Sequence, residues 1–348
     1  MAVVKREFSK SSKGEQAYLY EITNTAGMKA VVSDFGATLV SLYVPDKDGK
    51  MRDIVWGCDD VAGYEGDKNP YFGATVGRIA NRVGDAIVTI NGVDYPMDKN
   101  DNGNCLLGGF DGYHIRMWDA EMSDASVRFS LLSPDGDQGL PGNFQISVTY
   151  ILTEANGLHI VYDGVSDQDT YVSMTNHSYF NLNGEDGNSI LNHELWINAD
   201  KFTMTDERLI PTGEMVDVTG TAMDFRVSKK VGRDIDNDEA ALKLGGGYDH
   251  NWALNSHKAE EPVVKVYSEE SGIEMEVFTD CPGIQFYAGN FLTDEPGKGG
   301  RIYGKRSAMA FETQRFPDSM HHENFPNALQ KAGERFHTET EYRFGIKG

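Results

Sequence analysis

The sequence predicts an all-β protein whose strands pair mostly antiparallel, and three observations lead to this fold class. Residues 144–152 alternate apolar and polar side chains, which is the period of a strand with one buried face. Residues 158–162 repeat the alternation after the turn Ala155-Asn156-Gly157, so the two segments predict a hairpin. Helical candidates are few, and one of them is 235–244, which is acidic at first and then rich in alanine.

The first hundred residues favour a meander of strands. Strand-like segments run over 18–22, 29–33 and 38–44, and Pro45 with the turn at 47–50 ends the last of them. A break follows at 69–82, where an aromatic pair precedes small residues and two arginines. The arginines require acidic or hydroxyl partners, so a surface ion pair and a ligand contact both fit them.

The hairpin leads toward an unusual strand-like stretch with several polar side chains. It reads Thr175-Asn176-His177-Ser178-Tyr179-Phe180-Asn181-Leu182. If this stretch is extended, His177, Tyr179 and Asn181 share one face, because side chains alternate along a strand. The alternative interpretation is a buried strand whose polar atoms bind backbone groups and have no catalytic role.

The second half of the chain continues with short strands and one glycine-rich turn. Short strands are expected at 195–198 and 202–204, and an alternating pair at 263–267 and 273–278. The glycines at 245–247 are not a phosphate-binding loop, because no Lys-Ser or Lys-Thr follows them. They are better suited to present Asp249 or His250.

Glu312 lies in the apolar strand-like segment 309–317, where a carboxylate is costly unless it is paired or neutral. Two interpretations follow from the local sequence. Glu312 is half of a structural ion pair with Arg315 or Arg306, or it is a base whose pKa is tuned by its surroundings.

Composition limits the function classes. The 348 residues include 32 Lys and Arg against 54 Asp and Glu, and the net charge of −22 disfavours nucleic acid and anionic lipid as partners. The N-terminus has no apolar signal region, and no later run reaches the roughly 18 apolar residues of a membrane helix. Three widely spaced cysteines fit reduced thiols. We therefore expect a cytoplasmic protein that does not bind a membrane.

Five segments in chain order carry a resemblance to a known family. They are Gly77-Arg78-Ile79-Ala80-Asn81-Arg82, Asn176-His177-Ser178-Tyr179-Phe180-Asn181-Leu182, Gly247-Tyr248-Asp249-His250, Pro282-Gly283-Ile284-Gln285-Phe286-Tyr287 and Glu312-Thr313-Gln314. Together they resemble the aldose 1-epimerase family, also called galactose mutarotases. The resemblance implies one domain over 1–348, a large antiparallel β-sandwich with few short helices and an open sugar cleft. It also implies an isomerase that needs no cofactor or metal.

Carried over residue by residue, the resemblance implies that Glu312 is the general base and His177 the general acid. The implied sugar-binding residues are Asn81, Arg82, Tyr179, Asp249 and Gln285. The reaction interconverts the α and β anomers of a hexose, which requires one group to take the anomeric proton and another to protonate the ring oxygen. A desolvated glutamate and a histidine suit this work. The implied partner is a monosaccharide, and the chain is expected to be a monomer or homodimer.

Three alternatives stay open at this point. A glycoside hydrolase needs two carboxylates about the scissile bond, which Glu312 and Asp249 could supply. A sugar-binding module would not need both Glu312 and His177. A metal site could use His177, His250 and the pair at 321–322, although no known ligand spacing is present.

One loop departs from the family. Where the family usually has Asn-x-Leu-His-Gly-Gly, this chain has Asn104-Cys105-Leu106-Leu107-Gly108-Gly109, so Leu107 stands in place of a second histidine. Leucine cannot donate a hydrogen bond to the ring oxygen. Unless His114 takes over this role, we expect a slow epimerase or one shifted to an unusual sugar.

Overall fold

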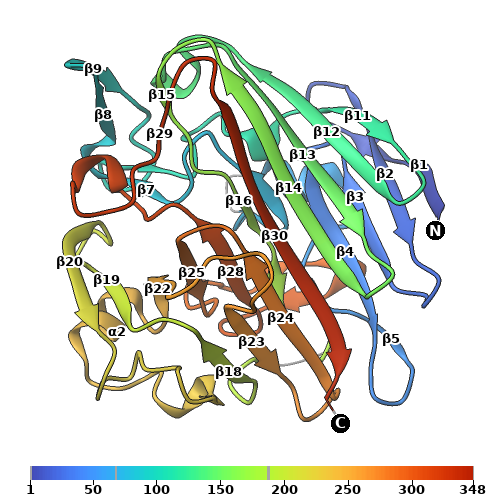
Figure 1. The fold of residues 1–348 in the computed structure, drawn as a ribbon. Helices are drawn as coiled ribbons and strands as arrows, with labels where there is room; N and C mark the ends of the chain where they lie inside the picture. The colour runs from blue at the N-terminus through green and yellow to red at the C-terminus, as the bar shows by residue number, and fades with distance from the viewer. Residues whose placement is uncertain (1, 67–68, 186–188, 348) are drawn as a thin grey trace.

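Three antiparallel sheets form the frame of the protein in the computed structural model, which describes residues 2–66, 69–185 and 189–347 (Figure 1). The first sheet has the order β1 (Ala2–Lys10), β2 (Gln16–Thr23), β3 (Lys29–Ser33), β4 (Thr38–Pro45) and β5 (Met51–Asp53). Neighbours in this sheet are consecutive in the chain, so the predicted meander at the N-terminus is confirmed.

The largest sheet has nine strands in the described part of the chain. Their order is β11 (Asp119–Met122), β12 (Ser126–Ser133), β13 (Phe144–Leu152), β14 (Gly157–Ser166), β30 (Arg335–Ile346), β24 (Ile273–Thr279), β23 (Val264–Tyr267), β18 (Glu194–Ile197) and β21 (Lys229–Lys230). The hairpins expected near residues 155 and 270 are β13 with β14 and β23 with β24. The C-terminal strand β30 lies between β14 and β24 and joins the two hairpins into one sheet (Figure 1).

The third sheet carries much of the candidate site. Its order is β17 (Tyr179–Phe180), β28 (Met309–Gln314), β25 (Gly283–Tyr287), β22 (Asp249–Ala253), β19 (Lys201–Thr205) and β20 (Pro211–Asp217). Two-stranded pairs complete the strands: β6 (Ala74–Val76) with β16 (Thr175–His177), β7 (Arg82–Val83) with β10 (Cys105–Leu106), β8 (Ile87–Ile90) with β9 (Val93–Pro96), β15 (Thr170–Tyr171) with β29 (Leu329–Gln330), and β26 (Glu295–Pro296) with β27 (Ile302–Tyr303).

A shared core holds the three sheets face to face. One continuous cluster of buried side chains includes Tyr20 of β2, Val148 of β13 and Phe286 of β25, so each sheet contributes an apolar face. Along β13 the inward residues Phe144 and Ile146 are buried, as the alternation predicts. The all-β sandwich expected from the sequence is confirmed.

The two α-helices in the described ranges are short: α1 (Val61–Glu65) and α2 (Ala240–Gly245). The helix expected over 235–244 is therefore half wrong, because the chain is still extended at Glu239. Asp236 instead pairs with Arg306, and Asp side chains favour turns over helix interiors. No described helix has the length and apolar character needed to cross a membrane.

The stretch 175–182 is not one continuous strand. β16 pairs with β6, whereas β17 pairs with β28, so the chain passes from one sheet to another at Ser178. Asn176 fixes this bend, because its Oδ1 accepts hydrogen bonds from the backbone N and the hydroxyl of Ser178. The expectation of one shared face fails for Asn181, whose amide donates to the Ser307 carbonyl.

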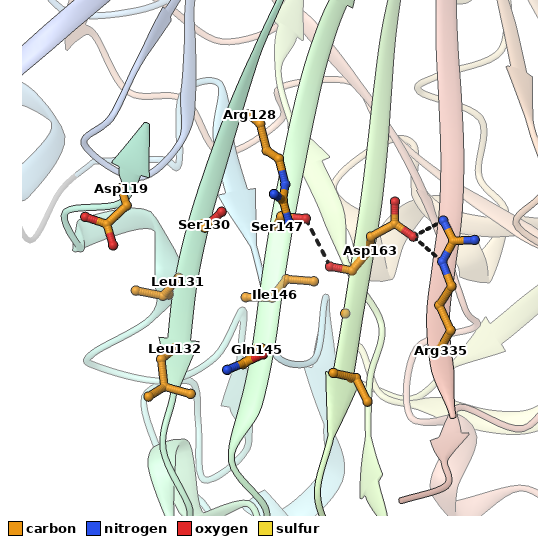
Figure 2. A pocket seen from close by; sticks show the side chains of 12 residues that line it. Asp119, Arg128, Ser130, Leu131, Leu132, Gln145, Ile146, Ser147, Asp163 and Arg335 are labelled. Atoms are coloured by element: carbon orange, nitrogen blue, oxygen red, sulfur yellow. Dashed lines mark hydrogen bonds and ion pairs between the residues drawn. The ribbon is translucent and has the colours of Figure 1, made fainter. Parts of the chain in front are cut away.

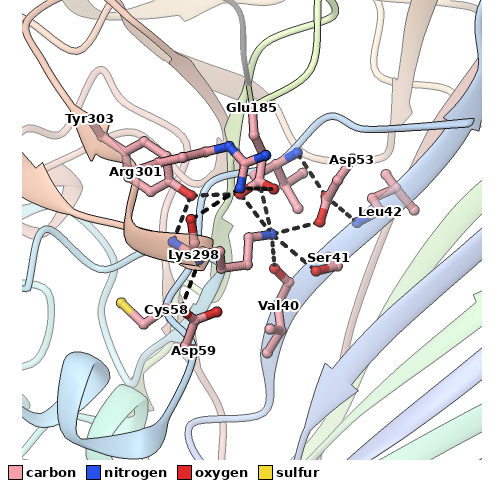
Figure 3. A network of polar contacts seen from close by, with 12 residues as sticks. Val40, Ser41, Leu42, Asp53, Cys58, Asp59, Glu185, Lys298, Arg301 and Tyr303 are labelled. Carbon is pink, nitrogen blue, oxygen red and sulfur yellow. Dashed lines mark hydrogen bonds and ion pairs between the residues drawn. The ribbon is translucent and has the colours of Figure 1, made fainter.

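A buried lysine ties the loop before β27 to the first sheet (Figure 3). Lys298 Nζ donates to Asp53 Oδ2 at 2.8 Å, to two backbone carbonyls and to a serine hydroxyl. Glu185 Oε1 lies 3.3 Å from the same ammonium group and accepts a hydrogen bond from Tyr303. Tyr303 in turn packs edge-on against Phe72, and Phe72 packs edge-on against Tyr179. The Lys298 network is therefore connected through two ring contacts to Tyr179 of β17.

Candidate active site

A cavity of about 140 Å³ brings together most of the residues expected to act on a sugar. Its lining comprises Pro70, Tyr71, Asn81, Arg82, Leu106, Leu107, His177, Tyr179, Asp249, Tyr287, Phe291 and Glu312. Six of the seven predicted site residues are in this set, and Gln285 is the exception. The volume suits a single small sugar ring.

Glu312 lies at the buried end of the cavity. It is on β28 with 3% of its surface exposed, and its Oε2 has no hydrogen-bond partner among the described residues. Burial raises the pKa of Glu312 to about 8, the nearby charge of Asp249 adds to the increase, and Arg82 opposes it. Of the two interpretations of this carboxylate, the ion pair with Arg315 or Arg306 is not found among the described residues: Glu312 contacts His177, and Arg306 binds Asp236. Glu312 is thus a desolvated carboxyl group facing a cavity.

His177 is the closest ionisable partner of Glu312. Its Nε2 lies 3.5 Å from Glu312 Oε1, and only 7% of the residue is exposed. Burial lowers the pKa of His177 to about 4. The imidazole is flanked by the rings of Tyr179 and Tyr71, with centroids 5.0 and 6.0 Å away. The structure therefore places a carboxyl group and an imidazole side by side in a buried site flanked by two tyrosine rings.

Arg82 and Asn81 form the basic side of the cavity. Asn81 adopts a positive φ of 58°, and its Oδ1 accepts a hydrogen bond from the backbone N of Arg82. Arg82 Nε donates to Asp101 Oδ2 at 2.8 Å. This bond fixes the guanidinium group by one edge, and a fixed planar guanidinium can offer its other N–H groups to hydroxyl oxygens.

Asp249 is oriented by Gln285 from the neighbouring strand. Gln285 Nε2 donates to Asp249 Oδ1 at 2.7 Å, and the two residues lie on the paired strands β22 and β25. Gln285 itself is buried and does not line the cavity. The amide therefore acts on the cavity through the aspartate.

Tyr179 contributes a ring rather than a free hydroxyl. Its OH donates to the Pro70 carbonyl at 2.9 Å, and the ring packs edge-on against Phe72. This leaves Tyr179 to shape the wall of the cavity beside His177.

Apart from Tyr179, sequence reasoning missed the aromatic residues of the lining. Tyr71, Tyr287 and Phe291 line the cavity, and Phe291 is 54% exposed although it is a large apolar side chain. Its backbone N is held by the Tyr287 hydroxyl at 2.8 Å, and its ring stacks on Tyr287. The aromatic pair at 71–72 was the only local signal, and it did not indicate a direction for either ring.

Leu107 lines the cavity, and His114 packs nearby against Tyr71, which also lines it. The ring of His114 packs against Tyr71 at 4.5 Å, and His114 is not among the described residues that line the cavity. Burial lowers the pKa of His114 to about 4, and the nearby His177 adds to the decrease. The buried Nδ1 of His114 has no hydrogen-bond partner among the described residues, so the role of His114 beside Leu107 stays a prediction.

In the described part of the chain, no other candidate site places a buried carboxyl group beside an imidazole at the wall of a cavity. A larger groove of about 430 Å³ crosses the outer face of the nine-stranded sheet, where Asp163 is paired with Arg335 (Figure 2). The Arg335 side chain is exposed, and Asp163 also contacts His337 at 3.0 Å. The histidines considered for a metal site bind different protein groups. His250 contacts the Ala241 carbonyl, and His321 contacts Asp318. Within the described ranges no group of three metal-binding side chains is found.

An antiparallel sandwich with a buried acid and imidazole facing a ring-sized cavity is the architecture of a sugar-converting enzyme, and comparison with known proteins agrees. The sequence profile described as aldose 1-epimerase matches residues 18–343. A galactose mutarotase of Mus musculus is 40% identical over 316 residues, covering 90% of each chain. An aldose 1-epimerase of Escherichia coli is 36% identical, covering 95% of this chain and 96% of that one.

The solved structure of an aldose epimerase homologue from C. elegans superposes with a TM-score of 0.87 at 34% identity. It covers 95% of this chain and 100% of that chain. The chain belongs to the aldose 1-epimerase family.

Proposed function

We propose that this chain interconverts the α and β anomers of an aldose by opening and closing the sugar ring. Glu312 takes the proton of the anomeric hydroxyl, and His177 gives a proton to the ring oxygen. The observation that carries the proposal is the 3.5 Å contact between Glu312 and His177 in a cavity of ring size. The unpartnered Oε2 of Glu312 supports it, because an open acceptor is what a base must offer to a hydroxyl.

The pair needs only one proton for the whole cycle. Burial raises the pKa of Glu312 and lowers the pKa of His177, so in the empty site the proton resides on Glu312 and both groups are neutral. Moving this proton to His177 gives a carboxylate and an imidazolium, the base and acid that ring opening requires. A bound sugar favours this charged form, because its hydroxyl donates to the carboxylate and its ring oxygen accepts from the imidazolium.

After ring opening, Glu312 is protonated and His177 is neutral. Rotation about the bond between C1 and C2 presents the other face of the aldehyde. Ring closure then returns the proton of the C5 hydroxyl to His177 and transfers the proton of Glu312 to the new anomeric oxygen. Arg82 and Asp249 hold ring hydroxyls during the cycle, with Asn81 and Tyr179 as nearby contacts and Gln285 as the group that orients Asp249.

Glu312→Gln tests the proposal directly. The amide keeps the shape of the side chain and cannot take the anomeric proton, so the enzymatic rate should fall by about 10² to 10⁴. The measurement is exchange between anomers of d-galactose by polarimetry or NMR, after subtraction of the spontaneous rate. The matched control is Glu121→Gln, an exposed carboxylate on the outer sheet, which should keep the parent rate. Retention of more than about half of the activity in Glu312→Gln would remove Glu312 from the mechanism.

The same preparation separates the alternative functions. A glycoside hydrolase would release nitrophenol from a nitrophenyl galactoside, and we expect no release. A binding module would show sugar affinity and no acceleration of anomer exchange. The proximity of Glu312 and His177 supports catalysis, because binding alone does not require an acid beside a base.

We further propose that residues 1–348 act as one domain in the cytoplasm, as a monomer or homodimer. The core shared by the three sheets supports the single domain. The three cysteines support a reducing compartment, since all are buried and free of disulfides.

A further inference from the structure

A short segment with an unusual backbone carries Asn81 and Arg82, which both line the cavity. Between residues 81 and 86 the chain has three positive φ angles outside glycine, at Asn81 (58°), Asp85 (56°) and Ala86 (53°). Such angles are costly for residues with a β-carbon and persist where neighbouring contacts hold the backbone. The direction of Arg82 therefore depends on the contacts that hold this segment.

Asp318 supplies two of these contacts from the loop that follows β28. Its backbone N donates to the Arg82 carbonyl at 3.1 Å, and its Oδ1 accepts a hydrogen bond from the backbone N of Gly84 at 2.8 Å. Asp318 thus binds the main chain at Arg82 and again two residues beyond it. Since β28 also carries Glu312, these bonds join the strand of the proposed base to the segment of the sugar-binding arginine.

The carboxylate of Asp318 binds this segment rather than its own turn. Asp318 is the N-cap residue of the 3-10 turn Ser319–His321, a place where an aspartate side chain can accept a hydrogen bond from the turn, and it makes no such bond. The residue is only 3% exposed. His321 Nδ1 lies 2.7 Å from its Oδ1, and His322 Nε2 lies 3.4 Å from its Oδ2. The hydrogen bond with Asp318 raises the pKa of His321. The carboxylate is thus fixed by contacts on both of its oxygens.

We propose that Asp318 is a positioning residue for sugar binding, whose buried carboxylate fixes the main chain at 82–84 and so directs the Arg82 guanidinium group into the cavity. The inference rests on the proposed function, in which Arg82 binds a ring hydroxyl. Asp101 holds Arg82 by Nε, so the place of the other guanidinium N–H groups also depends on the main chain. Asp318 acts through Arg82, because Arg82 lines the cavity and Asp318 is not among the described residues that do.

The test removes the carboxylate and separates binding from turnover. Asp318→Gly deletes the side chain without straining the backbone, because glycine accepts the φ of 55° at this position. A misplaced Arg82 loses a hydrogen bond to the sugar, so KM for d-galactose should rise by about ten-fold while kcat stays within about two-fold. Both constants are taken from anomer exchange by NMR. Asp318→Asn retains an oxygen acceptor for the Gly84 N–H and should recover most of the loss in KM.

Two further variants show whether Asp318 acts through Arg82. In Gly84→Ala the added β-carbon would lie 3.3 Å from Asp318 Oδ2, so the carboxylate must move by a few tenths of an ångström, and KM should rise by about three-fold or more. In Arg82→Met, adding Asp318→Gly should change kcat/KM by less than about two-fold, because the residue through which Asp318 acts is gone. The matched control is Asp124→Gly, in the exposed turn between β11 and β12, which should keep the parent KM.

The outcomes separate this inference from the proposed function. A parent KM in both Asp318→Gly and Gly84→Ala, or an equal effect of Asp318→Gly with and without Arg82, would overturn the role of Asp318 and leave the epimerase activity standing. A fall in kcat at unchanged KM would also overturn it, because the carboxylate would then act outside sugar binding. If Asp318→Gly does not fold, the KM of Gly84→Ala decides. No acceleration of anomer exchange by the parent protein would refute the epimerase activity itself, and the role of Asp318 with it.

Discussion

Asp249 is expected to have two effects in the cavity. Its side chain lines the space proposed for the sugar, and its negative charge affects the pKa of Glu312. Its negative charge helps to raise the pKa of Glu312. Asp249→Asn should therefore lower the pKa of Glu312, and the alkaline limb of the kcat/KM profile, where the free enzyme loses the one proton of the pair, should move to lower pH, since kcat/KM reports the free enzyme. Loss of a charge-assisted hydrogen bond should also raise KM on the order of ten-fold. From the sequence we expected a binding effect alone.

Gln285→Met is the control that separates these two effects. It removes the hydrogen bond to Asp249 Oδ1 and leaves the carboxylate charge in place. KM should rise as the aspartate loses its orientation, and the pH profile should stay where it is in the parent. A profile that is unmoved in Asp249→Asn would contradict the electrostatic coupling to Glu312.

At the residue scale, the sequence indicated which residues are candidates for catalysis better than it indicated which residues surround them. A carboxylate in an apolar strand is locally anomalous, so Glu312 could be singled out with two possible roles. Its pairing with His177 could not be derived from periodicity, because the residues are on strands in different sheets, and only the family resemblance linked them. Phe291 was missed because an aromatic residue in a strand-rich sequence is ordinarily part of the core.

At the scale of elements, the alternation of apolar and polar residues predicted the long hairpins. It failed where a local side-chain hydrogen bond bends the chain. β13 and β14 pair over the whole of β13, and most of their residues alternate between a buried and a more exposed face. The stretch 175–182 also alternates in extended form, yet Asn176 captures Ser178 and turns the chain into another sheet. Such a local side-chain bond competes with strand pairing and has no periodic signature.

Among the contacts between elements, the buried ion pairs of Lys298 are expected to contribute strongly to stability. It links the loop before β27 to β4 and β5, and its ammonium group lies against both Asp53 and Glu185 (Figure 3). Lys298→Met leaves the buried Asp53 carboxylate without its cation and leaves Glu185 with Arg301 at 3.9 Å, so the free energy of unfolding should fall by about 3 to 5 kcal/mol. The measurement is urea denaturation at neutral pH.

The control for Lys298 is Lys243→Met on α2. Lys243 pairs with Asp238, but its side chain is 62% exposed, and surface pairs contribute little. The free energy of unfolding should change by no more than about 0.5 kcal/mol. Equal losses in the two variants would show that the Lys298 network does not hold the loop.

At the scale of the whole molecule, the sequence predicted the layers through the resemblance and the hairpins through alternation. The placement of β30 between β14 and β24 pairs β30 with a strand about half of the chain's length away, and no local pattern specifies such a pairing. It is determined by the need to bury the apolar faces of both hairpins in one core.

The raised pKa of Glu312 should make the stability of the whole molecule depend on pH. A carboxyl group whose folded pKa exceeds its unfolded pKa holds its proton more tightly in the folded state. Between the ordinary value of 4.5 and the raised pKa of about 8, the unfolded state binds fewer protons, so stability falls as pH rises. Glutamine does not titrate. Glu312→Gln should therefore unfold at a higher temperature than the parent at pH 8, and the difference should shrink to nothing below pH 4.5.

Scanning calorimetry of both proteins at several pH values between 4.5 and 8.5 checks this expectation. His177 works in the opposite sense, because its lowered pKa adds stability as pH rises from about 4 to 6.5. Since both proteins retain His177, this contribution largely cancels in the difference between them. A parent that is as stable as Glu312→Gln at pH 8 would mean that the folded protein bears the Glu312 charge at no cost. Burial of the carboxyl group would then not raise its pKa, and the one-proton cycle would lose its basis.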